Sequence, residues 1–155
     1  SWFFITADYT FGAALQRDVT GFVTEAGGKV VGSIKYPFPG TTDFSSLLLQ
    51  AQSSGAKILG VANAGADTTN TIKQAQAATG VDRLHAVIGG FHLPPPLSDD
   101  YVRETVAEMK AAGPDWVIPA HCAGERFYDL ARVEMPGRIV RAAVGSLFSF
   151  GTKAG

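Results

Sequence analysis

Short apolar runs alternate along this chain with longer segments in which apolar residues recur every three or four positions. Residues 2–6 form the first such run, and Phe11, Leu15 and Val19 mark the helical spacing of the segment that follows. The runs predict strands at residues 2–6, 29–36, 56–62, 83–88, 116–119 and 138–143, with a final one at 147–150. The periodic segments predict helices at residues 10–26, 43–53, 98–111 and 124–132. A further helix is expected to begin at a cap, Asp67 or Thr68, and to end near residue 79.

Strands that alternate with amphipathic helices are typical of a parallel sheet whose right-handed crossovers place helices on both faces. The pattern therefore predicts a single α/β domain over residues 1–155. We expect a three-layer sandwich, Rossmann-like or flavodoxin-like, around a mostly parallel sheet of five to seven strands. The first three strands are expected in the order 2-1-3, with the later strands added beside the third.

The composition excludes several classes of protein. The chain has 155 residues, 46% of them hydrophobic, so it can bury a core without a disulfide or a metal ion. A formal net charge of −1 provides no field that would attract nucleic acid or an anionic membrane. No apolar run approaches the roughly 20 residues of a membrane span, and residues 1–4 lack the features of a secretion signal. We therefore expect a soluble chain, cytoplasmic as given, with no nucleic-acid or membrane partner.

Two further features concern association and redox chemistry. The single cysteine, Cys122, excludes an intramolecular disulfide and leaves a thiol that is free or binds something. The apolar segment at residues 144–150 would form an exposed edge of the predicted sheet. Because exposed edge strands readily pair with other chains, we expect a homodimer.

The first half of the chain carries three motifs, WFFITADYTFG at residues 2–12, DFSS at residues 43–46 and NAGADT at residues 63–68. With these motifs, residues 1–80 resemble one lobe of a substrate-binding protein, the periplasmic component of ABC transporters for branched-chain amino acids and related compounds. The resemblance implies a small-molecule ligand that sits between two lobes. It also implies ligand contacts at Tyr9 and in the loop from Asn63 to Asp67.

The second half carries two different motifs, VIGGFHL at residues 87–93 and VIPAHCAG at residues 117–124. They resemble the C-terminal part of a metallo-β-lactamase-fold hydrolase, in the branch with a Gly-Gly-Phe-His-Leu turn and a His-Cys-Thr-Gly turn. Ala123 stands here in place of the threonine. The resemblance implies that His92 and His121 belong to a metal-site region. The His-x-His-x-Asp-His loop of such enzymes is absent from the sequence, which excludes an ordinary two-metal site.

Together the two resemblances indicate a chimera, natural or constructed, in which residues 1–80 and 81–155 come from unrelated proteins. Both parts consist of strand–helix units with the same handedness, so one sheet can continue into the other without a change of layers. We therefore expect the junction near residues 80–82 to lie inside a single domain.

The polar residues that follow the predicted strands are the candidates for chemistry, because ligands bind beyond the carboxyl ends of parallel strands. These residues are Asp8 after the first strand, Asn63 and Asp67 after the third, His92 after the fourth, and His121 with Cys122 after the fifth. If the fourth and fifth strands are neighbours, about 4.8 Å apart, both imidazoles can reach one ion. Two histidines with a carboxylate or a thiolate are an adequate zinc ligand set that leaves one position open for water. The alternative is that the histidines are ordinary loop residues and Cys122 a small buried hydrophobe.

Two functions follow from these residues. The first is a zinc-dependent hydrolase that attacks activated phosphoesters or related esters through a zinc-bound water. It places His92, His121 and Cys122 at the metal, and Asp8 and Asp67 as catalytic carboxylates or further ligands. The alternative is a non-enzymatic chimeric fold or small-molecule binding module, whose ligand contacts are Tyr9 and Asn63. The sequence contains no Gly-x-Gly-x-x-Gly or Gly-x-Ser-x-Gly motif, so nucleotide binding and serine hydrolysis have no support.

Overall fold

The computed structural model describes residues 1–81, 83–93 and 96–150. Its elements in chain order are β1 (Trp2–Ala7), α1 (Thr10–Glu25), β2 (Val30–Tyr36), α2 (Ser45–Ser53), β3 (Ile58–Ala62), α3 (Ala66–Thr79), β4 (Ala86–Gly89), α4 (Asp99–Ala112), β5 (Trp116–Pro119), the short 3₁₀ helix η1 (His121–Ala123) and α5 (Gly124–Glu134). All strand pairs between these elements are parallel, which confirms the predicted α/β class. Among the helices within the described ranges, none is both long and apolar enough to cross a bilayer.

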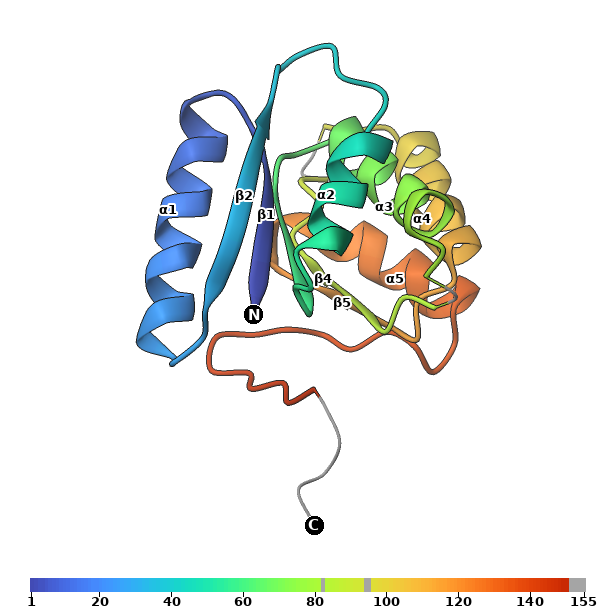
Figure 1. Ribbon diagram of the computed structural model, residues 1–155. Coiled ribbons are helices and arrows are strands. Elements are labelled where there is room, and N and C mark those ends of the chain that lie inside the picture. The colour runs from blue at the N-terminus through green and yellow to red at the C-terminus, as the bar shows by residue number, and fades with distance from the viewer. Residues whose placement is uncertain (82, 94–95, 151–155) are drawn as a thin grey trace.

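β1 lies at the centre of a three-stranded sheet with the order β2-β1-β3, as predicted. Ile5 lies opposite Ile34 on one side and Val61 on the other. The five residues from Phe3 to Ala7 are all buried, which is the pattern of a strand covered on both faces. α1 covers one face of the sheet, and α2 with α3 lies over the other (Figure 1). This part of the chain is therefore the expected three-layer sandwich.

Alternate residues of β1 serve the two faces. Phe3 and Ile5 pack with Phe44 and Leu48 in a cluster of buried side chains under α2. On the opposite face, the Thr6 hydroxyl donates a hydrogen bond of 2.6 Å to Gln16 of α1. Both faces are therefore buried, and the face under α1 combines the buried ring of Phe4 with a polar contact.

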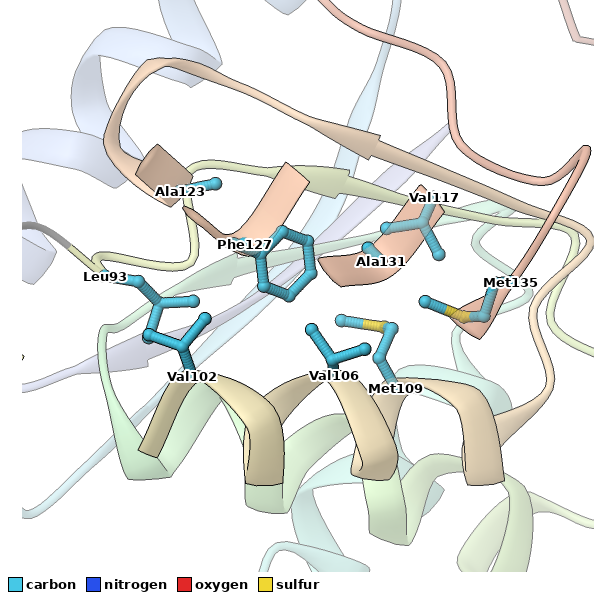
Figure 2. Packing of buried hydrophobic residues seen from close by; sticks show 9 residues of the cluster. All are labelled: Leu93, Val102, Val106, Met109, Val117, Ala123, Phe127, Ala131 and Met135. Atoms are coloured by element: carbon cyan, nitrogen blue, oxygen red, sulfur yellow. The ribbon is translucent and has the colours of Figure 1, made fainter. Parts of the chain in front are cut away.

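β4 and β5 form a second sheet, with its own hydrophobic cluster. Val87 lies opposite Val117, and residues 138–140 run along the other side of β5 through hydrogen bonds of 2.9 and 3.0 Å to Val117. α4 and α5 pack together against this sheet. Figure 2 shows the buried side chains of this cluster, which come from the two helices, from β5 and from the adjoining segments: Leu93, Val102, Val106, Met109, Val117, Ala123, Phe127, Ala131 and Met135.

α3 connects the two clusters. Its Ile72 packs against the cluster beneath α4 and α5, while Ala75 and Ala78 pack against the cluster beneath α2. An ion pair between Lys73 and Glu108 also joins α3 to α4. The two sheets are thus tied together through a helix.

The prediction that the later strands are added beside the third strand is wrong. Within the described ranges, β4 pairs with β5 and not with β3, so the strands form two sheets. Backbone hydrogen bonds from Asp115 to Leu84 and from Trp116 to His85 also join the segment before β4 to β5. β4 itself is shorter than predicted, since it begins at Ala86 rather than at residue 83. The apolar pattern identifies a strand but carries no information about which other strand it meets.

The predicted strands at the end of the chain are corrected as well. Residues 138–143 contribute an isolated bridge at Ile139, and residues 147–150 are irregular. A turn intervenes, in which Gly145 has a φ of +87° and Ser146 donates a hydrogen bond of 3.0 Å to the Ala143 carbonyl. Val144 and Leu147 are exposed. The expected homodimer through residues 144–150 stays a prediction.

Gly12 brings α1 very close to the ends of two strands. A Cβ at this position would overlap the Ala7 carbonyl oxygen and lie 3.1 Å from the Ala62 carbonyl oxygen. Glycine is therefore required here for close approach of backbone to backbone. Gly21, in the same helix, has open space around its missing Cβ.

We expect Gly12→Ala to destabilise the fold by about 1–3 kcal/mol, because the added methyl group forces α1 away from β1 and β3. Gly21→Ala is the matched control and should stabilise by about 0.5–1 kcal/mol through helix propensity. Urea unfolding followed by far-UV circular dichroism measures both. Equal stability of the two variants would show that α1 does not depend on this contact.

Candidate functional site

The three strands of the first sheet end at one edge, which brings the segments after them together. β1, β2 and β3 end at Ala7, Tyr36 and Ala62. Because the strands are parallel, the residues that follow them lie at the same carboxyl edge of the sheet. α1 begins at Thr10, almost directly after β1, and α3 begins at Ala66, soon after β3. Both helices therefore start at this edge.

A network of polar side chains lies at the end of β3 and the start of α3. The Thr68 hydroxyl donates a hydrogen bond of 2.7 Å to Asn63 Oδ1, and Asn63 Nδ2 lies 3.4 Å from the hydroxyl of Thr71. Asn63 is buried, so its amide is satisfied by these contacts inside the protein. The predicted ligand contact at Asn63 therefore lies beneath the surface of the edge, where it orders the loop before α3.

Tyr36 joins β2 to the same network. Its hydroxyl donates a hydrogen bond of 2.7 Å to Asp67 Oδ2, and the side chain is buried. Burial raises the pKa of the Tyr36 hydroxyl well above its usual range, and the hydrogen bond to Asp67 raises that pKa further. Tyr36 therefore keeps the proton that it donates to Asp67 to a higher pH than a free tyrosine would. The predicted catalytic carboxylate Asp67 is thus engaged in a contact that connects β2 to α3.

Asp8, the other predicted catalytic carboxylate, lies on the surface. Its Oδ1 is 3.0 Å from Lys35 Nζ, and both side chains are more than half exposed. An ion pair with this exposure contributes little to stability. Asp8 and Lys35 together present one charge of each sign beside the ends of β1 and β2.

Aromatic rings complete this edge. Tyr9 stacks on Phe38, with ring centroids 4.5 Å apart and planes inclined by 17°. The centroid of Phe11, in the first turn of α1, lies 5.9 Å from that of Tyr9, which immediately precedes the helix. The predicted ligand contact Tyr9 therefore lies between two further aromatic rings.

Sequence reasoning missed Tyr36, Lys35 and Phe38. Ligands bind beyond the carboxyl ends of parallel strands, and the second strand of the sheet is no exception. Residues 35–38 surround the end of β2, so the same rule indicates them.

The second sheet places the predicted metal ligands after its two strands. β4 and β5 are neighbours, as the zinc hypothesis requires, and Gly89 lies opposite Pro119. The Leu93 amide donates a hydrogen bond of 2.7 Å to the Cys122 carbonyl, and a Cβ on Gly90 would overlap Cys122 Sγ. His92, with a φ of +53°, and His121 are exposed. The two loops thus lie together at one edge.

No group of three histidine, cysteine or acidic side chains that could hold a metal ion occurs in the part of the chain that the structure describes. Asp8 and Asp67, the expected carboxylate ligands, belong to the edge of the first sheet. Cys122 faces the backbone of Gly90. Zinc binding by His92, His121 and Cys122 therefore stays a prediction.

A narrow crevice lies between α3 and α4. Its lining includes Gly65, Thr68 and Ile72 on one side and Tyr101 and Thr105 on the other. The crevice has a volume of about 10 Å³, which is room for about one water molecule. It is too small for an organic ligand in this conformation.

Comparison with known proteins identifies a family for the first part of the chain. The family model for periplasmic binding proteins matches residues 1–94. The match extends past the predicted junction near residues 80–82, so it does not support a change of family there. No comparison supports the predicted metallo-β-lactamase resemblance of residues 81–155, and the curated proteins give no match.

Three solved structures are similar to the chain. A periplasmic binding protein from Burkholderia mallei is 55% identical over 52% of this chain, with a TM-score of 0.48. An amino acid ABC transporter substrate-binding protein from Pseudomonas fluorescens is 23% identical over 69% of the chain, with a TM-score of 0.56. A branched-chain amino acid ABC transporter periplasmic ligand-binding protein from Burkholderia xenovorans is 26% identical over 90% of the chain, with a TM-score of 0.52. The chain spans 21%, 27% and 36% of the lengths of these three proteins.

The hydrogen bond between Tyr36 and Asp67 has a consequence at alkaline pH. Because the pKa of Tyr36 is raised in the folded state, the unfolded chain loses this proton first as the pH passes about 10. The unfolded state then binds fewer protons, so the free energy of unfolding falls with rising pH, by up to about 1.4 kcal/mol per pH unit. Below that pH the contribution is fully present.

Tyr36→Phe should remove this part of the alkaline slope and destabilise the protein by about 1–2 kcal/mol at neutral pH, since Asp67 loses its donor. Tyr128→Phe on α5 serves as the control and should retain the slope. Urea unfolding at several pH values measures both effects. The same alkaline slope in Tyr36→Phe and in the unmodified protein would contradict the assignment.

Proposed function

The chain belongs to the periplasmic binding protein family, and from this we propose that the first sheet forms part of a lobe that binds a small polar molecule at its carboxyl edge. The observation that carries the proposal is the convergence of three strand ends at that edge. Asp8, Tyr9 and Tyr36 with the loop before α3 gather there. Of the two functions that the sequence suggests, this is the small-molecule binding module and not the zinc-dependent hydrolase.

An amino acid or a related compound is the ligand class that we propose. Two of the similar structures are described as binding proteins of amino acid transporters. The edge offers acceptors for an ammonium group at Asp8 and Asp67. A carboxylate of the ligand can meet Lys35 and the first turn of α1. That turn has no acidic residue and no side-chain cap, so its backbone N–H groups are free of side-chain acceptors and favour a negative charge. Groups of both signs beside each other suit a ligand that carries both charges.

Binding should be measurable by NMR titration of the chain with L-leucine, at concentrations up to the millimolar range. We expect amide shifts in residues 8–12 and 63–68. Tyr9→Ala should weaken the affinity about five- to tenfold, because a central aromatic contact is lost. Tyr128→Ala, the same change on α5, is the control and should bind as the unmodified chain does. Shifts confined to other parts of the protein would overturn the proposed site.

A zinc site after β4 and β5 is the second proposal, and the parallel pairing of these strands favours it. His92 and His121 would be the nitrogen ligands and Cys122 the thiolate. With one position open for water, zinc at such a site would provide a hydroxide for ester hydrolysis. The relatives found by comparison are binding proteins, so the hydrolase is the weaker proposal.

The zinc hypothesis expects one zinc per chain after incubation with the metal and gel filtration, measured by plasma mass spectrometry. His92→Ala and His121→Ala should each abolish the uptake, because two remaining ligands hold zinc weakly. His85→Ala is the matched control, since His85 lies before β4 with Nδ1 3.1 Å from Asp115, at the opposite end of the strand. Absence of stoichiometric zinc in the unmodified chain, or an equal loss in His85→Ala, would reject the site.

A further inference from the structure

We propose that Tyr9, Phe11 and Phe38 form an aromatic platform that binds a planar ring of the ligand, so that the ligand is an aromatic amino acid or a related aromatic acid. The inference rests on the proposed function, because it assigns a ligand class to the same edge of the first sheet. It adds Phe11 and Phe38 to the residues that contact the ligand.

The three rings come from two different segments of the chain. Tyr9 and Phe11 lie at the start of α1, whereas Phe38 lies in the loop after β2. Tyr9 is the central ring, with centroids 4.5 Å from Phe38 and 5.9 Å from Phe11. These separations are within the range of direct aromatic contacts. The platform is therefore continuous although its members are far apart in sequence.

The outer rings of the platform remain open to solvent. Phe11 is 48% exposed and Phe38 is 37% exposed. Single exposed apolar residues are common, but a contiguous group of exposed rings is typical of a binding surface. A ligand ring laid against Phe11 or Phe38 would remove apolar area from water on both partners.

The position of the platform links the rings to the polar groups of the edge. Asp8 immediately precedes Tyr9, and its partner Lys35 lies on β2 three residues before Phe38. Tyr36, two residues before Phe38, reaches Asp67 at the start of α3. A ligand whose charged end meets these groups can therefore place a side chain on the platform.

Aromatic ligands gain more from this surface than aliphatic ones of similar size. Stacked and edge-to-face ring pairs are favourable beyond the area that they bury, because the face and the edge of a ring carry opposite partial charges. A branched aliphatic side chain buries area but lacks this contribution. The platform therefore favours L-phenylalanine over L-leucine, although both carry the same charged groups.

The test compares L-phenylalanine, L-leucine and 3-phenylpropionate by NMR titration of the 155-residue chain. We expect L-phenylalanine to bind about two- to tenfold more tightly than L-leucine. Phe11→Leu and Phe38→Leu should each reduce this preference, because the affinity for L-phenylalanine falls more than the affinity for L-leucine when a ring–ring contact is lost. Binding of 3-phenylpropionate would assign the ligand to aromatic acids in general, and its absence would restrict the ligand to aromatic amino acids; both results support the platform.

Phe22→Leu is the matched control. Phe22 is 67% exposed and lies on α1 eleven residues after Phe11, roughly 16 Å along the helix. It should leave the preference unchanged. Because the comparison of ligands on the unmodified chain needs no variant, the test does not depend on how well the variants fold.

Three results would overturn the platform. Equal affinities for L-phenylalanine and L-leucine would reject the aromatic ligand class while leaving the proposed function intact. An equal loss of preference in Phe22→Leu would show that the rings after β1 and β2 are not the site. Absence of binding by all three compounds would reject the platform together with amino-acid binding at this edge.

Discussion

The candidate binding edge depends on the pairing of β1 with a strand on each side. β1 is hydrogen-bonded to β2 and to β3, and its residues from Phe3 to Ala7 are buried. A shift of one residue in this register would turn every β1 side chain to the opposite face of the sheet. It would also separate Ala7 from Tyr36, which lie opposite each other at the end of the sheet. The register therefore determines which side chains meet at the edge.

The first half of the fold could be predicted because its pattern and its packing agree. The apolar run of β1 and the helical spacing in α1 predict both elements to within a residue or two. The strand order 2-1-3 also follows, since consecutive strand–helix units with right-handed crossovers allow few arrangements. Local sequence is sufficient where each element packs against its neighbours in the chain.

The rest of the fold and part of the site could not be predicted from local pattern. β4 and β5 pair with each other rather than with β3, and α3 packs on both α2 and α4; these are contacts between segments, which no single segment reveals. The contact between Tyr36 and Asp67 joins residues 31 positions apart. The rings of Tyr9 and Phe38 likewise meet through the pairing of β1 with β2. The sequence therefore predicts that polar residues gather at the carboxyl edge of the first sheet. Which of these side chains contact each other follows only from the three-dimensional arrangement.

The position of α3 between two hydrophobic clusters makes the two sheets thermodynamically dependent on each other. Ile72 contributes to one cluster, and Ala75 and Ala78 contribute to the other. Loss of either cluster would expose apolar area on α3 and remove part of the packing that keeps it helical, since most helical stability comes from tertiary contacts. The two sheets should consequently form one cooperative unit, with the opening of one coupled to the opening of the other through a shared helix.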